Sequence, residues 1–214
     1  MEQYAIEISN AQKVFGQYTV LNDINVRFEQ GKIHGLIGRN GSGKTVLLKA
    51  ICGFISLTKG TIIVNQKVIG KDIDIPSDMG IIIENPAFLS NYSGYKNLQF
   101  LANMKKIIGK EQIKQVIRQV GLNPDDKKWV GKYSLGMKQR LAIAQAIMEN
   151  PKILLFDEPM NGLDNQAVEY FRELFLKLRD NGTTIILSSH NSEDIDCLCD
   201  TLYKMEEGQL TKIR

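Results

Sequence analysis

Two different periods of hydrophobic residues divide the chain. Apolar and polar residues alternate in "YAIEIS" from Tyr4 and in "INVRFEQG" from Ile24, which predicts two half-buried strands. Short aliphatic runs predict further strands, the last two of them fully buried. These runs are "KIHGLIG" from Lys32, "GTIIVN" from Gly60, "MGIIIE" from Met79, "KILLFDEP" from Lys152 and "TTIILSSH" from Thr183.

Helical periodicity is concentrated between residues 87 and 150. Ile113, Val116, Ile117 and Val120 fall at i, i+3, i+4 and i+7, and Gly121 ends this predicted helix. Two more helices are predicted on either side of it, "GYKNLQFLANMKKII" and "SLGMKQRLAIAQAIMEN". This part of the chain is therefore expected to be helical throughout.

Together the patterns predict an α/β fold with a parallel sheet at its core. Strands alternate with helices that begin at Lys44 and after Asp164, and a short helix and a hairpin-like tail end the chain. An antiparallel β part precedes this core, and an α-helical subdomain is inserted into it. We expect one domain over residues 1–214, with the core in 1–86 and 151–214 and the helical subdomain at about 87–150.

Composition favours an ordinary globular protein. The 214 residues are 43% hydrophobic and carry a net charge of +3, so no nucleic-acid partner is expected. Three cysteines, Cys52, Cys197 and Cys199, are too few for a disulfide framework and favour a reducing compartment. Cys197 and Cys199 suggest a metal site, but half-buried helical residues are the preferred interpretation. No segment approaches the length of a membrane-spanning helix.

The stretch "GRNGSGKT", from Gly38 to Thr45, fits the phosphate-binding loop pattern in full. It follows a predicted strand and precedes a predicted helix, as that motif requires. The glycines let successive backbone N–H groups wrap around phosphates, and the helix N-terminus adds positive potential. Lys44 can reach the β- and γ-phosphates, and the Thr45 hydroxyl can hold Mg²⁺.

Three further polar residues end buried strands. Asp157 and Glu158 follow "ILLF", at the sheet edge where open α/β sheets bind ligands. Asp157 is expected to hold Mg²⁺ through water, and Glu158 to polarise the attacking water. His190 ends another buried strand and is expected to contact the γ-phosphate. His34 lies inside a strand and is interpreted as a packing residue.

With these motifs in order, the chain resembles the ATP-binding subunits of ABC transporters over nearly its whole length. The matching elements are the aromatic Phe15 in "KVFGQ", the phosphate loop, the signature "YSLGMKQR" from Tyr133, the strand "ILLFDE", the D-loop "NGLD" and the switch histidine, His190. The resemblance implies an ABC ATPase fold that binds ATP and Mg²⁺ and hydrolyses ATP. Phe15 is then expected to stack on the adenine.

The family's roles transfer residue by residue. The phosphate-loop residues implied to bind nucleotide are Gly38, Arg39, Asn40, Gly41, Ser42, Gly43, Lys44 and Thr45. Metal contacts are implied for Thr45, Glu84 and Asp157, and catalytic roles for Glu158 and His190. In the family two subunits pack head to tail, so the signature residues Ser134, Leu135, Gly136 and Met137 act on the nucleotide of the second subunit. Asp164 runs along the same interface.

The resemblance also implies partners and a location. A separate integral membrane permease and a second ATP-binding subunit, identical or not, are expected, with the chain cytoplasmic and peripheral on the inner face of the membrane. The family contacts its permease in the stretch from about Glu84 to Leu98. Pro86, Phe88, Leu89 and Tyr92 are apolar for a loop, which suits an interface. Packing beneath the helical subdomain is the alternative.

Two motifs depart from the family pattern. Where the usual signature is Leu-Ser-Gly-Gly-Gln, this chain has Leu135 in place of the first glycine and Met137 in place of the glutamine. Where the family usually has glutamine near the metal, this chain has Glu84. Glutamate keeps the length and the oxygen ligand but adds a charge.

Local sequence style suggests a subgroup. "IENPAF", "YSLGMKQRL" and "DEPMNGLD" resemble subunits of bacterial exporters for bacitracin and lantibiotic-type peptides. Export of a peptide antibiotic or another amphipathic compound is therefore expected. The competing class is a soluble ABC ATPase that works in DNA maintenance or on the ribosome, but the insert is short and only one cassette is present. A P-loop GTPase or kinase is disfavoured by the signature, the D-loop and His190.

Overall fold

The core of the molecule is a six-stranded sheet. The computed structural model describes residues 4–84 and 86–214, and the strand order is β10-β9-β3-β8-β7-β6. Five neighbouring strands, β9, β3, β8, β7 and β6, run parallel to one another. β10 pairs antiparallel with β9 and forms the expected terminal hairpin. The bounds are β3 Ile33–Ile37, β6 Met79–Ile82, β7 Ile153–Asp157, β8 Thr184–Ser188, β9 Thr201–Glu206 and β10 Gln209–Lys212.

A second, antiparallel sheet has the order β2-β1-β4-β5. Its strands are β1 Tyr4–Phe15, β2 Tyr18–Glu29, β4 Lys59–Val64 and β5 Lys67–Val68. β1 and β2 are longer than the sequence predicted, because register shifts let the hairpin continue to the pair Phe15–Tyr18. The two residues of β5 are too few for a periodic signal.

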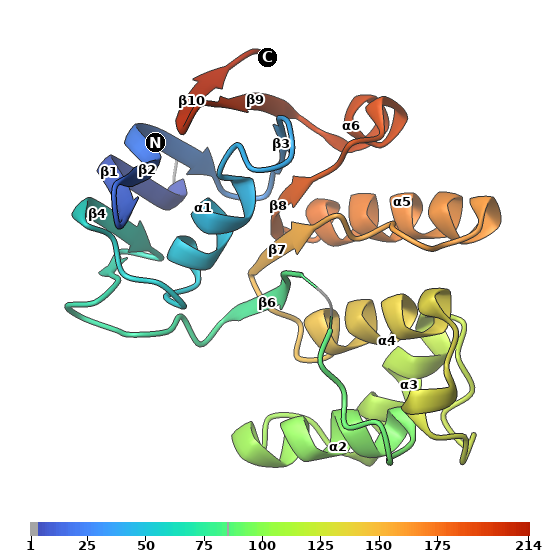
Figure 1. The fold of residues 1–214 in the computed structure, drawn as a ribbon. Helices are drawn as coiled ribbons and strands as arrows, with labels where there is room; N and C mark the ends of the chain where they lie inside the picture. Colours follow the sequence, from blue (N-terminus) through green and yellow to red (C-terminus); the bar gives the residue numbers. More distant parts are fainter. Residues whose placement is uncertain (1–3, 85) are drawn as a thin grey trace.

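Helices cover both faces of the six-stranded sheet. α1 (Lys44–Ile51) lies between the two sheets, and its Leu47 and Leu48 share one buried cluster with Phe28 of β2 and Leu155 of β7 (Figure 1). α5 (Asn165–Asp180) covers the other face, where Phe175 packs on Phe156 with ring centroids 4.9 Å apart. α6 (Ser192–Leu198) follows β8 directly. The predicted α/β fold class is confirmed.

The remaining helices form a separate group in Figure 1. They are α2 Gly94–Lys105, α3 Lys110–Gln119, a short 3-10 helix Val130–Lys132 and α4 Leu135–Ile147. α2 is shorter than predicted because Lys106 adopts a left-handed conformation (φ +57°), and its N–H bonds back to Ala102. One hydrophobic cluster runs from these helices into the face of the sheet that α5 covers.

His34 and the two neighbouring cysteines, Cys197 and Cys199, do not form a functional site among the described residues. His34 is fully buried, with Nδ1 2.6 Å from Thr201 Oγ1 and Nε2 2.9 Å from the carbonyl of Glu29, and burial lowers its pKa. Cys199 is buried and Cys197 is exposed. Within residues 4–84 and 86–214, no three His, Cys, Asp or Glu side chains are grouped as a metal site would require. The described helices include none long and apolar enough to cross a membrane.

Candidate nucleotide-binding and catalytic site

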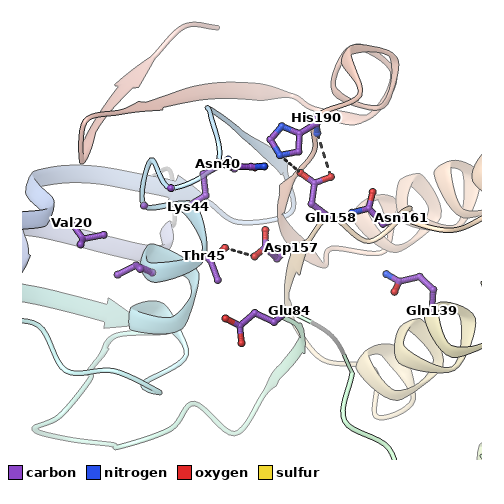
Figure 2. A pocket seen from close by; sticks show the side chains of 13 residues that line it. Val20, Asn40, Lys44, Thr45, Glu84, Gln139, Asp157, Glu158, Asn161 and His190 are labelled. Carbon is purple, nitrogen blue, oxygen red and sulfur yellow. Dashed lines mark hydrogen bonds and ion pairs between the residues drawn. The ribbon is translucent and has the colours of Figure 1, made fainter. Parts of the chain in front are cut away.

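A cavity of about 550 Å³ opens where the parallel strands end and α1 begins. Figure 2 shows the side chains around it, which come from β2, the phosphate loop and α1, from the end of β7, from the segments that follow β6, β7 and β8, and from α4. Its lining comprises Val20, Asn40, Gly41, Gly43, Lys44, Thr45, Val46, Glu84, Gln139, Asp157, Glu158, Asn161 and His190. Most of the residues that the sequence assigned to phosphate, metal and catalysis are thus neighbours.

The phosphate loop leads into α1 with its backbone N–H groups uncapped. Gly43 precedes the helix at φ +112°, and no side chain caps the helix start. A side chain at Gly43 would meet the carbonyl oxygen of Val20 at 2.9 Å, so only glycine fits there. Lys44 is buried, and its Nζ donates to the carbonyls of Gly38 (2.6 Å) and Arg39 (3.1 Å). The loop therefore offers unpaired N–H donors and one ammonium group at a helix N-terminus.

Thr45 and Asp157 form the next part of the site. The Thr45 hydroxyl donates to Oδ2 of Asp157 at 2.6 Å (Figure 2). The Ser188 hydroxyl donates to Oδ1 at 2.5 Å. Asp157 and Ser188 are partners in register at the ends of β7 and β8. The carboxylate is therefore held by two hydroxyls, one from the phosphate-loop helix and one from the neighbouring strand.

Glu158 and His190 face one another across the top of the cavity. Glu158 Oε1 lies 3.3 Å from His190 Nε2, and the backbone N–H of His190 donates to Oε2 at 3.4 Å. Burial raises the pKa of Glu158, while His190 opposes the shift. A carboxyl with a raised pKa is a better proton acceptor near neutral pH than an ordinary glutamate. Glu158 Oε1 is buried and has no hydrogen-bond donor among the described residues.

A buried polar network supports the segment that carries His190. Arg172 of α5 donates to Oδ1 of Asp194 through Nη2 (2.6 Å) and Nε (2.9 Å). The hydroxyl of Ser189, next to His190, donates to Oδ2 of the same carboxylate at 3.1 Å. The backbone N–H of Asn191 donates in turn to Ser189 Oγ. This network was not predictable from the sequence, because a lone arginine on a helix gives no sign of its burial.

Glu84 lines the cavity but its carboxylate is paired elsewhere. Its Oε1 accepts from Lys49 Nζ of α1 at 2.6 Å, and the side chain is exposed. The backbone of Glu84 is left-handed (φ +60°) where β6 ends. The expected metal contact therefore needs this carboxylate to leave Lys49.

Phe15 lies at the tip of the β1–β2 hairpin with its ring 46% exposed. Lys13 Nζ stands 4.8 Å from the ring centroid and also donates to the carbonyl of Ser56 at 2.7 Å. Among the described residues, Val20 of β2 lines the cavity and Phe15 does not. One face of the ring is therefore covered by Lys13.

The signature residues are not part of this cavity. Ser134 caps α4, with its Oγ accepting from the N–H of Met137 at 3.2 Å, and Leu135 is 62% exposed. From the same helix only Gln139 reaches the cavity, as Figure 2 shows. Asn161 lines the cavity as the first residue of the D-loop, whereas Gln139 was not predicted as a site residue because it lacks a distinctive chemistry.

Comparisons with known proteins agree with this architecture. The family described as ABC transporter matches residues 21–161. The ABC transporter ATP-binding protein YybJ of Bacillus subtilis (strain 168) is 45% identical over 96% of this chain and 94% of its own length. The bacitracin transport ATP-binding protein BcrA of Enterococcus faecalis is 42% identical over 98% and 69%. The lantibiotic transport ATP-binding protein SrtF of Streptococcus pyogenes is 36% identical over 96% and 88%.

Solved structures share the fold. The dimeric ATP-binding cassette MJ0796 bound to ADP and Pi has a TM-score of 0.87 at 20% identity and covers 98% of this chain and 99% of its own. An ATP-binding subunit of an ABC transporter has a TM-score of 0.88 at 24% identity, covering 98% and 89%. The relatives carry transport names, which favours a transporter over the DNA- or ribosome-associated alternatives. The chain belongs to the ABC transporter family and is an ATP-binding, ATP-hydrolysing subunit of a transporter.

Proposed function

We propose that this chain hydrolyses MgATP at a site shared between two ATP-binding subunits and so powers export of a peptide antibiotic through a separate permease. The observation that carries the proposal is the arrangement of the cavity. Lys44, Thr45, Asp157, Glu158 and His190 line it together, whereas Ser134 stands outside it. The cavity of one chain therefore lacks signature residues, and a second chain can supply them.

The phosphate loop and α1 hold the phosphates. The uncapped N–H groups before α1 and the ammonium of Lys44 supply positive potential where the β- and γ-phosphates lie. Lys44 exchanges its carbonyl partners for phosphate oxygens, since both kinds of partner accept the same N–H donors. The adenine stacks on the face of Phe15 that Lys13 leaves open.

The donor set near Thr45 fits Mg²⁺. One hydroxyl and one carboxylate lie 2.6 Å apart, and oxygen ligands of this kind are those that Mg²⁺ prefers. Thr45 and Asp157 would hold the ion, with Glu84 as a further oxygen ligand. Bound there, Mg²⁺ neutralises charge that develops on the phosphates.

Glu158 accepts the proton of the attacking water. Its raised pKa and its buried Oε1, which accepts no hydrogen bond from the described residues, suit a general base. His190 stands 3.3 Å away and keeps this carboxylate oriented, and it can contact the γ-phosphate from the same side. The buried pair of Arg172 and Asp194 fixes the chain on which His190 lies.

A second subunit supplies Ser134 and Gly136 to the nucleotide. The Ser134 hydroxyl and the start of α4 then face the γ-phosphate, where the positive end of the helix dipole favours an anion. Asp164 lies along the same interface, capping α5 through the N–H of Ala167 at 2.8 Å. ATP thereby holds the two subunits together until it is hydrolysed.

The permease contacts an apolar surface around α2. We define this surface by Leu89, Tyr92, Phe100, Met104 and Ile107, each at least 40% exposed. Tyr92 and Phe100 pack edge to face with centroids 5.1 Å apart, so the surface continues from the loop onto the helix. Exposed apolar area of this kind is typical of an interface. Pro86 is half-buried, and Phe88 packs against the core. Of the four apolar residues expected in this loop, Leu89 and Tyr92 therefore belong to the exposed surface. Contact with a permease places the chain on the inner face of the membrane.

A cargo of the peptide-antibiotic class is supported by the relatives. BcrA is named for bacitracin transport and SrtF for lantibiotic transport, at 42% and 36% identity. The test is to delete the gene for this chain in its host and to measure the growth-inhibiting concentrations of bacitracin and of a lantibiotic. Lower tolerance, restored by the wild-type chain but not by Lys44→Ala, supports the proposal. Unchanged tolerance to both, or rescue by Lys44→Ala, contradicts it.

A further inference from the structure

The first turns of α4 pack against the loop that leaves the catalytic strand. Gln139 is buried, and its Nε2 donates to the carbonyl of Pro159 at 2.7 Å. Arg140 Nη2 lies 3.5 Å from Oδ2 of Asp164. A side chain at Gly136 would meet the carbonyl oxygen of Gly162 at 2.9 Å. One face of the signature helix is therefore fitted to the loop from Pro159 to Asp164.

Leu135 adds an apolar contact to this packing. A methyl group at Gly162 would lie 2.6 Å from both Cγ and Cδ2 of Leu135, so the leucine already fills the space beside that glycine. Gly162 has a left-handed backbone (φ +77°). The usual signature of the family has glycine where Leu135 stands, and glycine has no side chain that could make this contact.

The loop connects this contact to Glu158. The N–H of Asn161 donates to the carbonyl of Glu158 at 3.2 Å, and the N–H of Leu163 donates to that of Met160 at 3.2 Å. These turns leave little slack between Gly162 and the backbone of the catalytic residue.

We propose that Leu135 is a positioning residue that braces the D-loop (Asn161–Asp164) against the signature helix. This inference rests on the proposed function, in which Ser134 contacts the nucleotide of the second subunit. With the brace in place, the signature that serves the partner's ATP and the loop that leads from this chain's own Glu158 move as one unit. Leu135 thereby makes a contact that the family's glycine cannot make, and it ties the two ATP sites together.

A double-mutant cycle tests the brace. ATP hydrolysis is measured for the wild-type chain with its permease, and for Leu135→Ala, Gly162→Ala and the double variant. Backbone strain from Gly162→Ala is the same in both backgrounds and cancels in the cycle. We expect Gly162→Ala to lower kcat at least three times more in the Leu135 background than in the Leu135→Ala background. Leu135→Met keeps an apolar side chain at this contact, so Gly162→Ala should lower kcat at least three times more in the Leu135→Met background than in the Leu135→Ala background.

Three readouts separate the possible outcomes. If the two substitutions lower kcat additively, the brace is overturned. It is also overturned if they are coupled only in the melting temperature, because Leu135 and Gly162 would then contribute to packing alone. The same double-mutant cycle is also made in the Glu158→Gln background, where ATP-dependent dimerisation of the chain is measured without its permease. Additive effects of the two substitutions on dimerisation also overturn the brace. A wild-type transporter that fails to hydrolyse ATP would instead overturn the proposed function, which the brace variants do not test.

Discussion

Arg172 of α5 and Asp194 of α6 form a buried ion pair, with Nη2 of the arginine 2.6 Å from Oδ1 of the aspartate. The two side chains are only 5% and 2% exposed. Asp194 also accepts from Ser189, the residue that precedes His190. The pair thus joins the helix behind the sheet to the segment that presents the switch histidine.

Removing one partner of this pair should destabilise the protein. Asp194→Asn leaves the Arg172 charge buried and partly unpaired, and we expect a loss of about 3–5 kcal/mol in the free energy of unfolding. The measurement is urea unfolding of the isolated chain. Glu193→Gln is the matched control, because Glu193 also bonds Arg172 but is exposed, so its loss should cost far less stability than the loss of Asp194. Equal effects of the two substitutions would show that burial of the pair is unimportant.

Glu158→Gln should separate ATP binding from hydrolysis. The amide keeps the shape of the side chain but cannot take a proton from water, so we expect kcat to fall by about 10²–10⁴-fold. ATP contacts through Lys44 and Thr45 are untouched, so the variant should accumulate as an ATP-bound dimer. Size-exclusion chromatography with and without MgATP measures this. An unchanged steady-state rate would remove Glu158 from the role of base.

The raised pKa of Glu158 predicts two pH effects. Hydrolysis needs the deprotonated carboxylate, so kcat should rise with pH through an apparent pKa above the ordinary glutamate value of about 4.3. For stability the sign is opposite. The folded chain binds this proton more readily than the unfolded chain, so the contribution of Glu158 is fully present below the unfolded pKa and is lost as pH rises through the folded pKa.

Melting temperatures check the stability effect. In nucleotide-free buffer, Glu158→Gln should melt above the wild type at pH 7, and the difference should shrink as pH falls below the unfolded pKa. A lower melting temperature for the variant at pH 7 would contradict the burial of a charged carboxylate at this position.

Glu84→Gln should keep measurable ATPase activity. Glutamine restores the family's usual residue and still offers an oxygen to the metal. It loses the ion pair with Lys49, but that pair is exposed on the glutamate side, so the stability cost should be below about 1 kcal/mol. The measurement is ATP hydrolysis beside nucleotide binding. Complete loss of activity with normal ATP binding would show that the charge of Glu84 is essential.

Much of this architecture was predictable because it is local in sequence. The phosphate loop, the acidic end of β7 and the two hydrophobic periods each depend on neighbouring residues, and the α/β class followed from their order. The register shifts in β1 and the left-handed turn at Lys106 were not predictable, since both depend on packing against distant strands and helices.

The missed parts of the site are long-range contacts. Arg172 and Asp194 are 22 positions apart, and Gln139 reaches Pro159 over 20 positions. Nothing in either local stretch shows that these polar side chains are buried. Ser188 is an intermediate case, because it is the last residue of β8 and could have been included with His190, two positions further along the chain.

The central claim is that each ATP site uses Lys44 of one chain and Ser134 of another. A mixing experiment tests it: Lys44→Ala and Ser134→Ala chains, each inactive alone, are reconstituted together with the permease, and ATP hydrolysis is measured. In a mixed pair one site carries both defects and the other carries none. Random pairing should therefore restore about a quarter of the wild-type rate in a two-fold symmetric dimer. A mixture no more active than either variant alone would contradict the shared site.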